Sequence, residues 1–224
     1  MMNTYRQYCP IARASEILAE RWNPLIIRNL MFGADTFSDL ARGVPAMSRS
    51  MLIKRLGEMQ RAGIVAKTQK RNGHGHLYFL TDAGKDLVDV IGSLGTWGER
   101  WVEVTTEHSD PGFALWAWCQ AQMDESQLPK ERTVIAFAFP DQLPTNRYYW
   151  FLIENGEAEM CYSDPGDDPA LEVEAESLPF VNWHRGALEW PQAVRSGQIR
   201  LRGSRELARS LPKWNTHVPR LGGK

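Results

Sequence analysis

The stretch MSRSMLIKRLGEMQRAGIV, residues 47–65, decides the fold of the first half of the chain. At 100° per residue, one side of a helix here carries Leu52, Leu56, Met59 and Gly63, and the opposite side carries Ser50, Lys54, Gly57 and Arg61. Ser48 is well placed to cap this helix. The apolar side predicts burial, and the opposite side is mostly basic.

That basic side contrasts with the charge of the whole chain. The 224 residues hold 26 Lys+Arg and 27 Asp+Glu, so the formal net charge is -1. Residues 40–71 hold eight basic residues and one acid, Glu58. Residues 1–107 hold 14 Lys+Arg against 11 Asp+Glu, and residues 108–224 hold 12 against 16. A local positive patch attracts polyanions even when the whole protein does not.

The flanking segments place this helix in a recognisable order. Helices are predicted over 10–21, from about Pro24 to Gly33, and from a Thr36 cap to Gly43. Strands are predicted over 64–70 and 76–81, joined by a turn at Asn72-Gly73, and Thr81 caps a long closing helix. Three helices, a wing and a closing helix predict a winged helix-turn-helix domain. Its recognition helix would meet DNA phosphates and base edges in the major groove.

The blocks CPIARASEILAERWNPLIIRNLMFG, TFSDLARGVPAMSRSMLIKRLGEMQRAGIV, YFLTDAG and LGTWGERW resemble the HxlR-type branch of MarR-like regulators over about residues 8–104. The resemblance implies a homodimeric repressor or activator that binds double-stranded DNA, pairs through its terminal helices and touches the minor groove or backbone with its wing. The implied DNA-binding residues are Thr36, Ser38, Ser48, Arg49, Ser50, Lys54 and Arg55 in the helix-turn-helix and Lys70, Arg71, His74 and His76 in the wing.

Within that set, position suggests different roles. Arg49 and Ser50, in the first turn of the helix, are expected to read bases, whereas Lys54, Arg55 and Lys70 are expected to hold phosphates. His74 and His76 have no third ligand nearby in sequence, so no metal site and no cofactor are expected.

Cys9 precedes Pro10 and lies at or next to the start of the first helix, where the helix dipole favours a thiolate. Some members of the resembling family use an N-terminal cysteine to sense oxidants. Two interpretations therefore stay open, a redox sensor and an inert cysteine. Cys9, Cys119 and Cys161 indicate neither a disulfide framework nor a metal site.

The closing helix contains Gly92, Gly95 and Gly98, each of which weakens an isolated helix by about 1 kcal/mol relative to alanine. A packed partner is therefore expected. It is either the first helix of the same domain or the same helix of a second subunit, and the palindromic operators of dimeric regulators favour the second.

A polar segment at 105–112 divides the chain into a DNA-binding and dimerisation domain, 1–107, and a second domain, 112–224. In the second, the predicted elements are a helix at 113–123, strands at 132–139, 147–163, 171–176 and 198–203 with a hairpin turn at Asn155-Gly156, two helical segments within 177–197, and a last helix capped by Ser204. The predicted class is α+β, with a five-stranded, mostly antiparallel sheet and helices on one side.

Residues 112–214, with SGQIRLRG before the last helix, resemble sterol-carrier-protein-type domains. The resemblance implies an apolar cavity between sheet and helices that holds a lipid-like or aromatic molecule. The candidate ligand-binding residues are Phe137, Trp150, Trp183 and Trp190. Such bulky side chains either fill the cavity or narrow it to a small flat ligand.

Catalytic motifs such as a Gly-rich phosphate loop, HExxH and GxSxG are missing, so an enzyme is not expected. No apolar run approaches the roughly 18 residues of a membrane span, and a cytoplasmic protein without membrane partners is expected. The predicted function is a homodimeric, sequence-specific transcriptional regulator controlled by an apolar effector. Two alternatives stay open: a redox-switched regulator using Cys9, with a structural second domain, and a lipid-carrier or ligand-storage protein.

Overall fold

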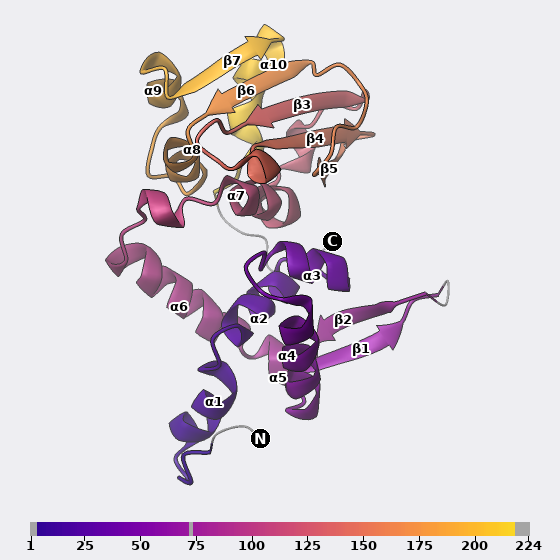
Figure 1. Cartoon of the computed structure of the whole chain (residues 1–224), viewed down its shortest axis with the longest axis vertical. Helices are drawn as coiled ribbons and strands as arrows, with labels where there is room; N and C mark the ends of the chain where they lie inside the picture. Colours follow the sequence, from indigo (N-terminus) through magenta and orange to yellow (C-terminus); the bar gives the residue numbers. More distant parts are fainter. Residues whose placement is uncertain (1–3, 72–73, 218–224) are drawn as a thin grey trace. The chain divides into compact units, whose positions relative to one another are not determined.

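The computed structural model describes residues 4–71 and 74–217. Within these ranges the chain divides into two compact units, one ending at Glu103 and the other beginning at Val104 (Figure 1). The predicted turn at Asn72-Gly73 lies outside the described residues.

The first unit has the element order of a winged helix-turn-helix domain. Its elements are α1 (Pro10–Leu18), α2 (Asn23–Met31), α3 (Phe37–Arg42), α4 (Arg49–Arg61), β1 (Val65–Gln69), β2 (His76–Leu80), α5 (Asp82–Lys85) and α6 (Val88–Trp101). The strands β1 and β2 pair antiparallel, with Val65 opposite Leu80, and form the wing.

Capping hydroxyls fix where three of these helices begin, because each accepts a backbone N–H that the helix leaves unpaired. Thr36 accepts from Asp39 at 3.1 Å, Ser48 from Met51 at 3.3 Å and Thr81 from Gly84 at 3.2 Å. The three predicted caps are confirmed.

The side of α4 predicted to be apolar lies in the core of the unit. Leu52, Leu56 and Met59 are at most 2% exposed. Gly63, however, follows the helix and adopts φ 75°, so it ends the helix rather than extending the apolar side. The buried Asn29 of α2 donates to the carbonyl of Leu40 at 3.2 Å. A Cβ on Gly43 would collide with this Asn29 amide, so the turn before α4 packs closely against α2.

The closing helix differs from the prediction because it consists of two pieces. The hydroxyl of Thr81 donates to the carbonyl of Gly63 at 2.6 Å, and a Cβ on Gly84 would collide with the carbonyl oxygen of Ile64. The short α5 is thereby fixed against the start of β1, and α6 begins separately at Val88. The first helix also ends earlier than predicted, at Leu18.

The second unit is an α+β structure, as predicted. Its regular elements are η1 (Thr106–His108), α7 (Pro111–Ala117), η2 (Trp118–Gln122), η3 (Glu125–Gln127), β3 (Thr133–Ala138), η4 (Pro144–Asn146), β4 (Tyr148–Glu154), β5 (Glu157–Cys161), β6 (Leu171–Ala175), α8 (Ser177–His184), α9 (Trp190–Arg195), β7 (Ile199–Gly203), α10 (Arg205–Ser210) and η5 (Leu211–Trp214). Ser204 caps α10 by accepting from the N–H of Leu207 at 3.3 Å.

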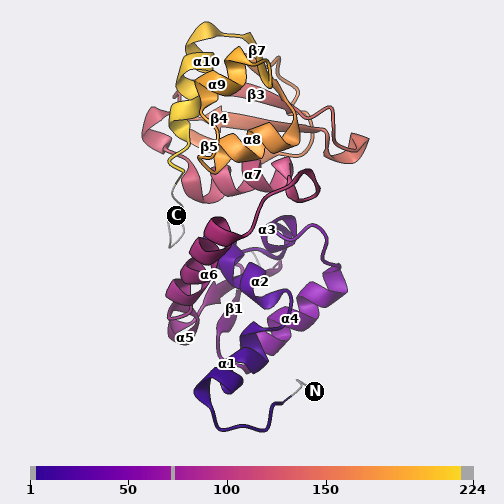
Figure 2. The same cartoon turned by 90° about the vertical axis from the view of Figure 1, so that its left-hand side faces the viewer.

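The five strands form one sheet in the order β5-β4-β3-β6-β7, in which only β3 and β6 are parallel. This confirms the predicted mostly antiparallel sheet. Asn155 and Gly156 have φ 55° and 81°, as a two-residue hairpin turn requires. In Figure 2, α8 and α9 lie in front of the strands. The strand register puts the buried residues Ile135, Phe151 and Val173 on one face of the sheet.

Aromatic rings fill the space between this face and the helices. Trp118 meets Phe137, Phe151 and Trp183 with ring centroids 6.3, 5.2 and 5.0 Å apart, in edge-to-face geometry. Its indole N–H donates to the carbonyl of Trp214 at 3.1 Å. The core of the second unit is therefore a packed aromatic cluster.

His184 is buried beside this cluster, next to Asn215 and His217. The side-chain amide nitrogen of Asn215 lies 3.2 Å from its Nδ1, and the ring of His217 contacts the carbonyl of His184 at 2.9 Å. Burial, and secondly the charge of His217, lower the pKa of His184 from 6.5 to about 4. The folded protein therefore holds this imidazole neutral.

The second unit should lose stability in mild acid. Because the unfolded chain protonates His184 near pH 6.5 and the folded chain only near 4, the stabilisation is complete above pH 6.5 and falls as the pH drops toward 4. Between pH 7 and pH 5 we expect a loss of about 2 kcal/mol. Urea titrations followed by tryptophan fluorescence measure it, since six of the nine tryptophans belong to residues 104–217.

The His184→Asn variant should have a flatter pH dependence than the parent protein. The control is His108→Asn, which alters an exposed histidine of the same unit. Equal pH dependence in the parent and the His184→Asn variant would contradict this assignment.

Candidate DNA interface

The outer side of α4 presents basic, polar and apolar side chains to solvent. The exposed residues are Arg49, Ser50, Ile53, Lys54 and Arg61. The guanidinium of Arg49 lies 5.0 Å from the centre of the Phe37 ring of α3, a cation–π contact that orients it at the start of the helix. The Ser48 and Ser50 hydroxyls lie 3.2 Å apart. The first turn of α4 thus carries a positioned cation beside two hydroxyls.

Arg55, predicted to hold a phosphate, has two carboxylate partners in the structure. Its side chain is only 12% exposed, and it bridges Glu20 at 2.5 Å and Glu58 at 2.7 Å. It therefore ties α4 to the segment between α1 and α2. Lys54, one residue earlier, has a side chain 61% exposed and lies 4.0 Å from Glu58, so it stays open to a phosphate.

In α3 the two predicted residues differ in their surroundings. The Thr36 hydroxyl caps the helix and donates to the Asp39 carboxylate, so its hydrogen-bonding capacity is already used. Ser38 is exposed. Thr36 accordingly has a structural role, while Ser38 is available to a partner.

The wing carries the remaining predicted residues. Arg71, His74 and His76 are exposed, and Lys70 is half-buried, with its N–H donating to the carbonyl of Gly75 at 3.1 Å. Gly75 adopts φ 87°, which a glycine tolerates at this bend. Cationic side chains thus flank the wing tip as well as α4.

Three contributors escaped the sequence prediction. Phe37 supports Arg49, Glu20 holds Arg55, and Ile53 is an apolar side chain 62% exposed in the middle of the outer side of α4. Ile53 could have been found, because the helical wheel places it outside the buried stripe. The partners of Arg49 and Arg55 belong to other elements and leave no signal in local periodicity.

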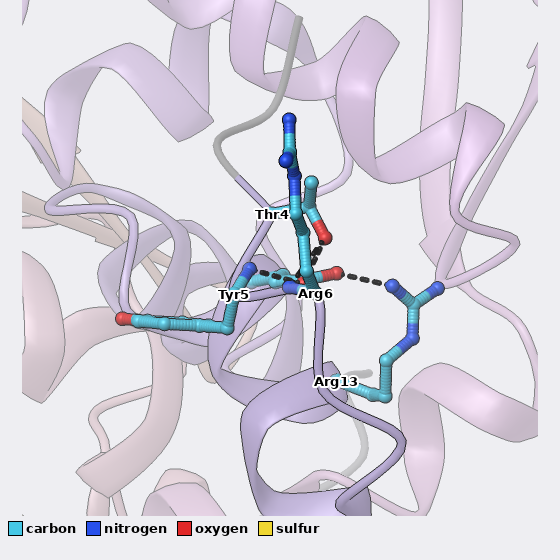
Figure 3. Close-up of polar contacts among 5 residues, drawn as sticks. Thr4, Tyr5, Arg6 and Arg13 are labelled. Carbon is cyan, nitrogen blue, oxygen red and sulfur yellow. Dashed lines mark hydrogen bonds and ion pairs between the residues drawn. The ribbon is translucent and has the colours of Figure 1, made fainter.

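Cys9 is the N-cap of α1, as predicted, and is half-buried. Among the residues that the structure describes, its side chain makes no capping hydrogen bond to α1. The preceding segment folds back on α1 through the Glu16 carboxylate. This carboxylate accepts from the Thr4 hydroxyl at 2.7 Å and the Tyr5 N–H at 2.8 Å and pairs with Arg13 at 2.6 Å (Figure 3). These contacts, led by that of Thr4, hold the pKa of Glu16 below its usual range.

The four candidate ligand-binding residues do not converge on one place. Phe137 and Trp183 belong to the packed aromatic cluster, and Trp190 contacts Trp183 with ring centroids 4.6 Å apart. Trp150 pairs directly with Ala136, on the face of the sheet opposite Phe137. Since residues opposite each other share a face, Trp150 is removed from the set.

Within residues 4–71 and 74–217, no group of three or more His, Cys, Asp or Glu side chains is arranged to hold a metal ion. The helices described in those ranges are also too short or too polar to span a bilayer.

Comparison with known proteins gives the class of the first unit. A family model described as HxlR-like helix-turn-helix matches residues 17–106. The uncharacterized HTH-type transcriptional regulator YvaP of Bacillus subtilis is 31% identical over 99 residues, 43% of this chain and 92% of YvaP. The HTH-type transcriptional regulator YodB of B. subtilis is 32% identical over 97 residues, 42% of this chain and 87% of YodB. The match to the structure of quinone-bound YodB covers 42% of this chain and 100% of the YodB chain, with 32% identity and a TM-score of 0.37.

The fold of the first unit and these relatives define a winged helix-turn-helix regulator that binds DNA. The chain belongs to the HxlR-like helix-turn-helix family. The family match ends at residue 106 and does not describe the second unit.

The two neighbouring cations of α4 should behave differently when replaced. Arg55→Met removes the ion pair to Glu20 and leaves Glu58 with only Lys54 at 4.0 Å, and we expect it to destabilise α4 by about 2 kcal/mol, less than for a completely buried pair. Lys54→Met should change stability by no more than about 0.5 kcal/mol. Hydrogen exchange of peptides from residues 49–61 measures both, and equal effects would contradict the structural role of Arg55.

Proposed function

We propose that this protein is a homodimeric, sequence-specific transcriptional regulator whose second unit binds a small-molecule effector. The observation that carries the DNA-binding part is the outer side of α4, where Arg49, Lys54 and Arg61 are exposed next to a wing bearing Arg71. A row of cations on a helix-turn-helix frame fits the phosphates that border a major groove.

The proposed contacts follow from how each side chain is held. Arg49, oriented by Phe37, is preorganised to donate two guanidinium N–H groups to the O6 and N7 acceptors of a guanine, and Ile53 is placed for apolar contact with a thymine methyl group. Ser50 is assigned to base edges together with Arg49, whereas Ser48 and Ser38 contribute hydroxyls near the DNA backbone. Lys54, Lys70, Arg71, His74 and His76 are assigned to phosphates or sugars.

Replacing these cations should separate affinity from specificity. With an operator selected from a random DNA pool, Lys54→Met should weaken binding to all sequences and reduce the salt slope by about one, because one counterion fewer is released. Arg49→Ala should cost about 1–3 kcal/mol and relax the preference at one base position. Lys85→Met, which removes an exposed lysine of α5, is the matched control. Salt-independent binding by the parent protein would favour the lipid-carrier alternative.

The proposal of a homodimer rests on α6. All of its residues are described, and none is buried. Val90, Leu94, Trp97 and Trp101 recur at helical spacing and are 49%, 53%, 58% and 65% exposed. Such a stripe is typical of an interaction surface. Within the described chain, a Cβ on Gly92, Gly95 or Gly98 would meet nothing within 4 Å, which favours a second copy over packing on the same domain's first helix.

A charge on this stripe should separate the subunits. We expect Trp97→Glu to convert the dimer to a monomer in analytical ultracentrifugation at micromolar concentration and to weaken operator binding more than tenfold, because paired half-sites need paired recognition helices. The control is Tyr148→Glu, a similarly exposed aromatic residue of the second unit. A parent protein that is monomeric at this concentration would overturn the proposal.

A second candidate function, favoured by one observation, is redox control through Cys9. Cys9 is half-buried, so it is partly accessible, and it is the N-cap of α1. In this alternative the second unit is a scaffold.

Oxidation of Cys9 should then change DNA binding. We expect diamide to lower operator affinity of the parent protein and to leave Cys9→Ser unaffected, with Cys161→Ser as the control because that cysteine is also half-buried. The readout is fluorescence anisotropy before and after reduction by dithiothreitol. An unchanged affinity of the oxidised parent protein would remove this function.

A further inference from the structure

A groove of about 500 Å³ lies in the second unit between α9, β7 and α10. Its apolar lining consists of Trp190, Pro191, Val194, Leu201, Ala208 and Pro212. Its size is in the range of small-molecule sites in proteins. The groove belongs to the part of the chain that the family match does not reach.

The apolar wall of the groove packs against the aromatic cluster of the second unit. Trp190 is 7% exposed and contacts Trp183, which is 2% exposed in the aromatic cluster, with the two ring planes inclined by 58°. Leu201 pairs with the buried Val173 but is itself only half-buried, because β7 is the edge strand of the sheet. The small accessible part of Trp190 and the rings of Pro191 and Pro212 provide apolar surface for an apolar body.

Three arginines complete the lining, and no acidic residue belongs to it. Arg195 ends α9, and Arg205 and Arg209 are one turn apart on α10. All three are exposed, and within the described part of the chain none has an ion-pair or hydrogen-bond partner for its guanidinium. By contrast, Arg200 pairs with Glu174 at 2.6 Å and Arg202 with Glu172 at 3.6 Å.

The unpaired arginines belong to a basic segment in an otherwise acidic half. Residues 185–213 contain seven Lys+Arg and two Asp+Glu, whereas residues 108–224 contain 12 and 16. A positive rim above an apolar floor matches a ligand with the reverse polarity, an apolar body that ends in an anion.

We infer that this groove binds a small aromatic carboxylate. The planar carboxylate accepts two parallel hydrogen bonds from a guanidinium fork, and the aromatic ring lies against the apolar lining, where Pro191 and Pro212 are more accessible than Trp190. The inference rests on the proposed effector control, names the chemical class of the effector and moves its site from the aromatic core to the groove.

The test uses the full chain and 2-naphthoate as the probe. Isothermal titration calorimetry should detect binding of 2-naphthoate, and 2-naphthalenemethanol, which has the same ring but no charge, should bind at least tenfold more weakly. Arg205→Gln with Arg209→Gln should weaken 2-naphthoate binding at least tenfold. The matched control is Arg200→Gln with Arg202→Gln, which removes the same number of positive charges outside the groove.

A second variant tests the apolar part. Ala208→Phe, at a half-buried position, should fill the groove and abolish binding without changing the circular dichroism spectrum. The inference is overturned if neither compound binds at millimolar concentration, if both bind equally, or if the two arginine pairs have equal effects. Binding that follows the expected pattern but leaves operator affinity unchanged would support the groove and overturn only the effector control.

Discussion

The burial of one side of α4 is the constraint on which the DNA interface depends. Leu52, Leu56 and Met59 fix the rotation of the helix, because turning it would expose them to water at a cost of about 1.5–3 kcal/mol per side chain. Rotation in turn decides which cations face outward. Lys54 and Arg55 are neighbours in sequence, yet one faces solvent and the other closes an ion-pair network.

Local chemistry made much of the first unit predictable from the sequence. Caps at Thr36, Ser48 and Thr81 require only contacts three residues away, and the apolar period of α4 requires only the helix itself. The role of Arg55 was not predictable in this way, because its partner Glu20 is 35 residues distant in sequence and a helical wheel does not include it. The break before α6 also depends on packing, since the contact between Gly84 and Ile64 forms only when the wing is folded.

In the second unit, the alternation of apolar residues predicted the strands, but the pairing register decides which aromatic residues face the core. The sheet could be predicted from period-two patterns and turn residues alone. Predicting the ligand site also required knowing on which face of the sheet each aromatic residue lies. Trp150 has the opposite parity to Tyr149 and Phe151 and so faces away from the cluster. One side of the groove could be predicted, because Arg205 and Arg209 are four residues apart in a helix that the Ser204 cap predicts. Its other side comes from α9 and depends on tertiary packing.

The glycines of α6 have a consequence for how the first unit folds. A helix with three glycines and no buried residue has little stabilisation beyond its contact with α2, and in the proposed dimer the second copy would supply the rest. Helix formation and subunit association are then one coupled event, and apparent stability rises with protein concentration. The cellular copy number of such a regulator would set both the fraction of operator occupied and the fraction of chains in which α6 is ordered.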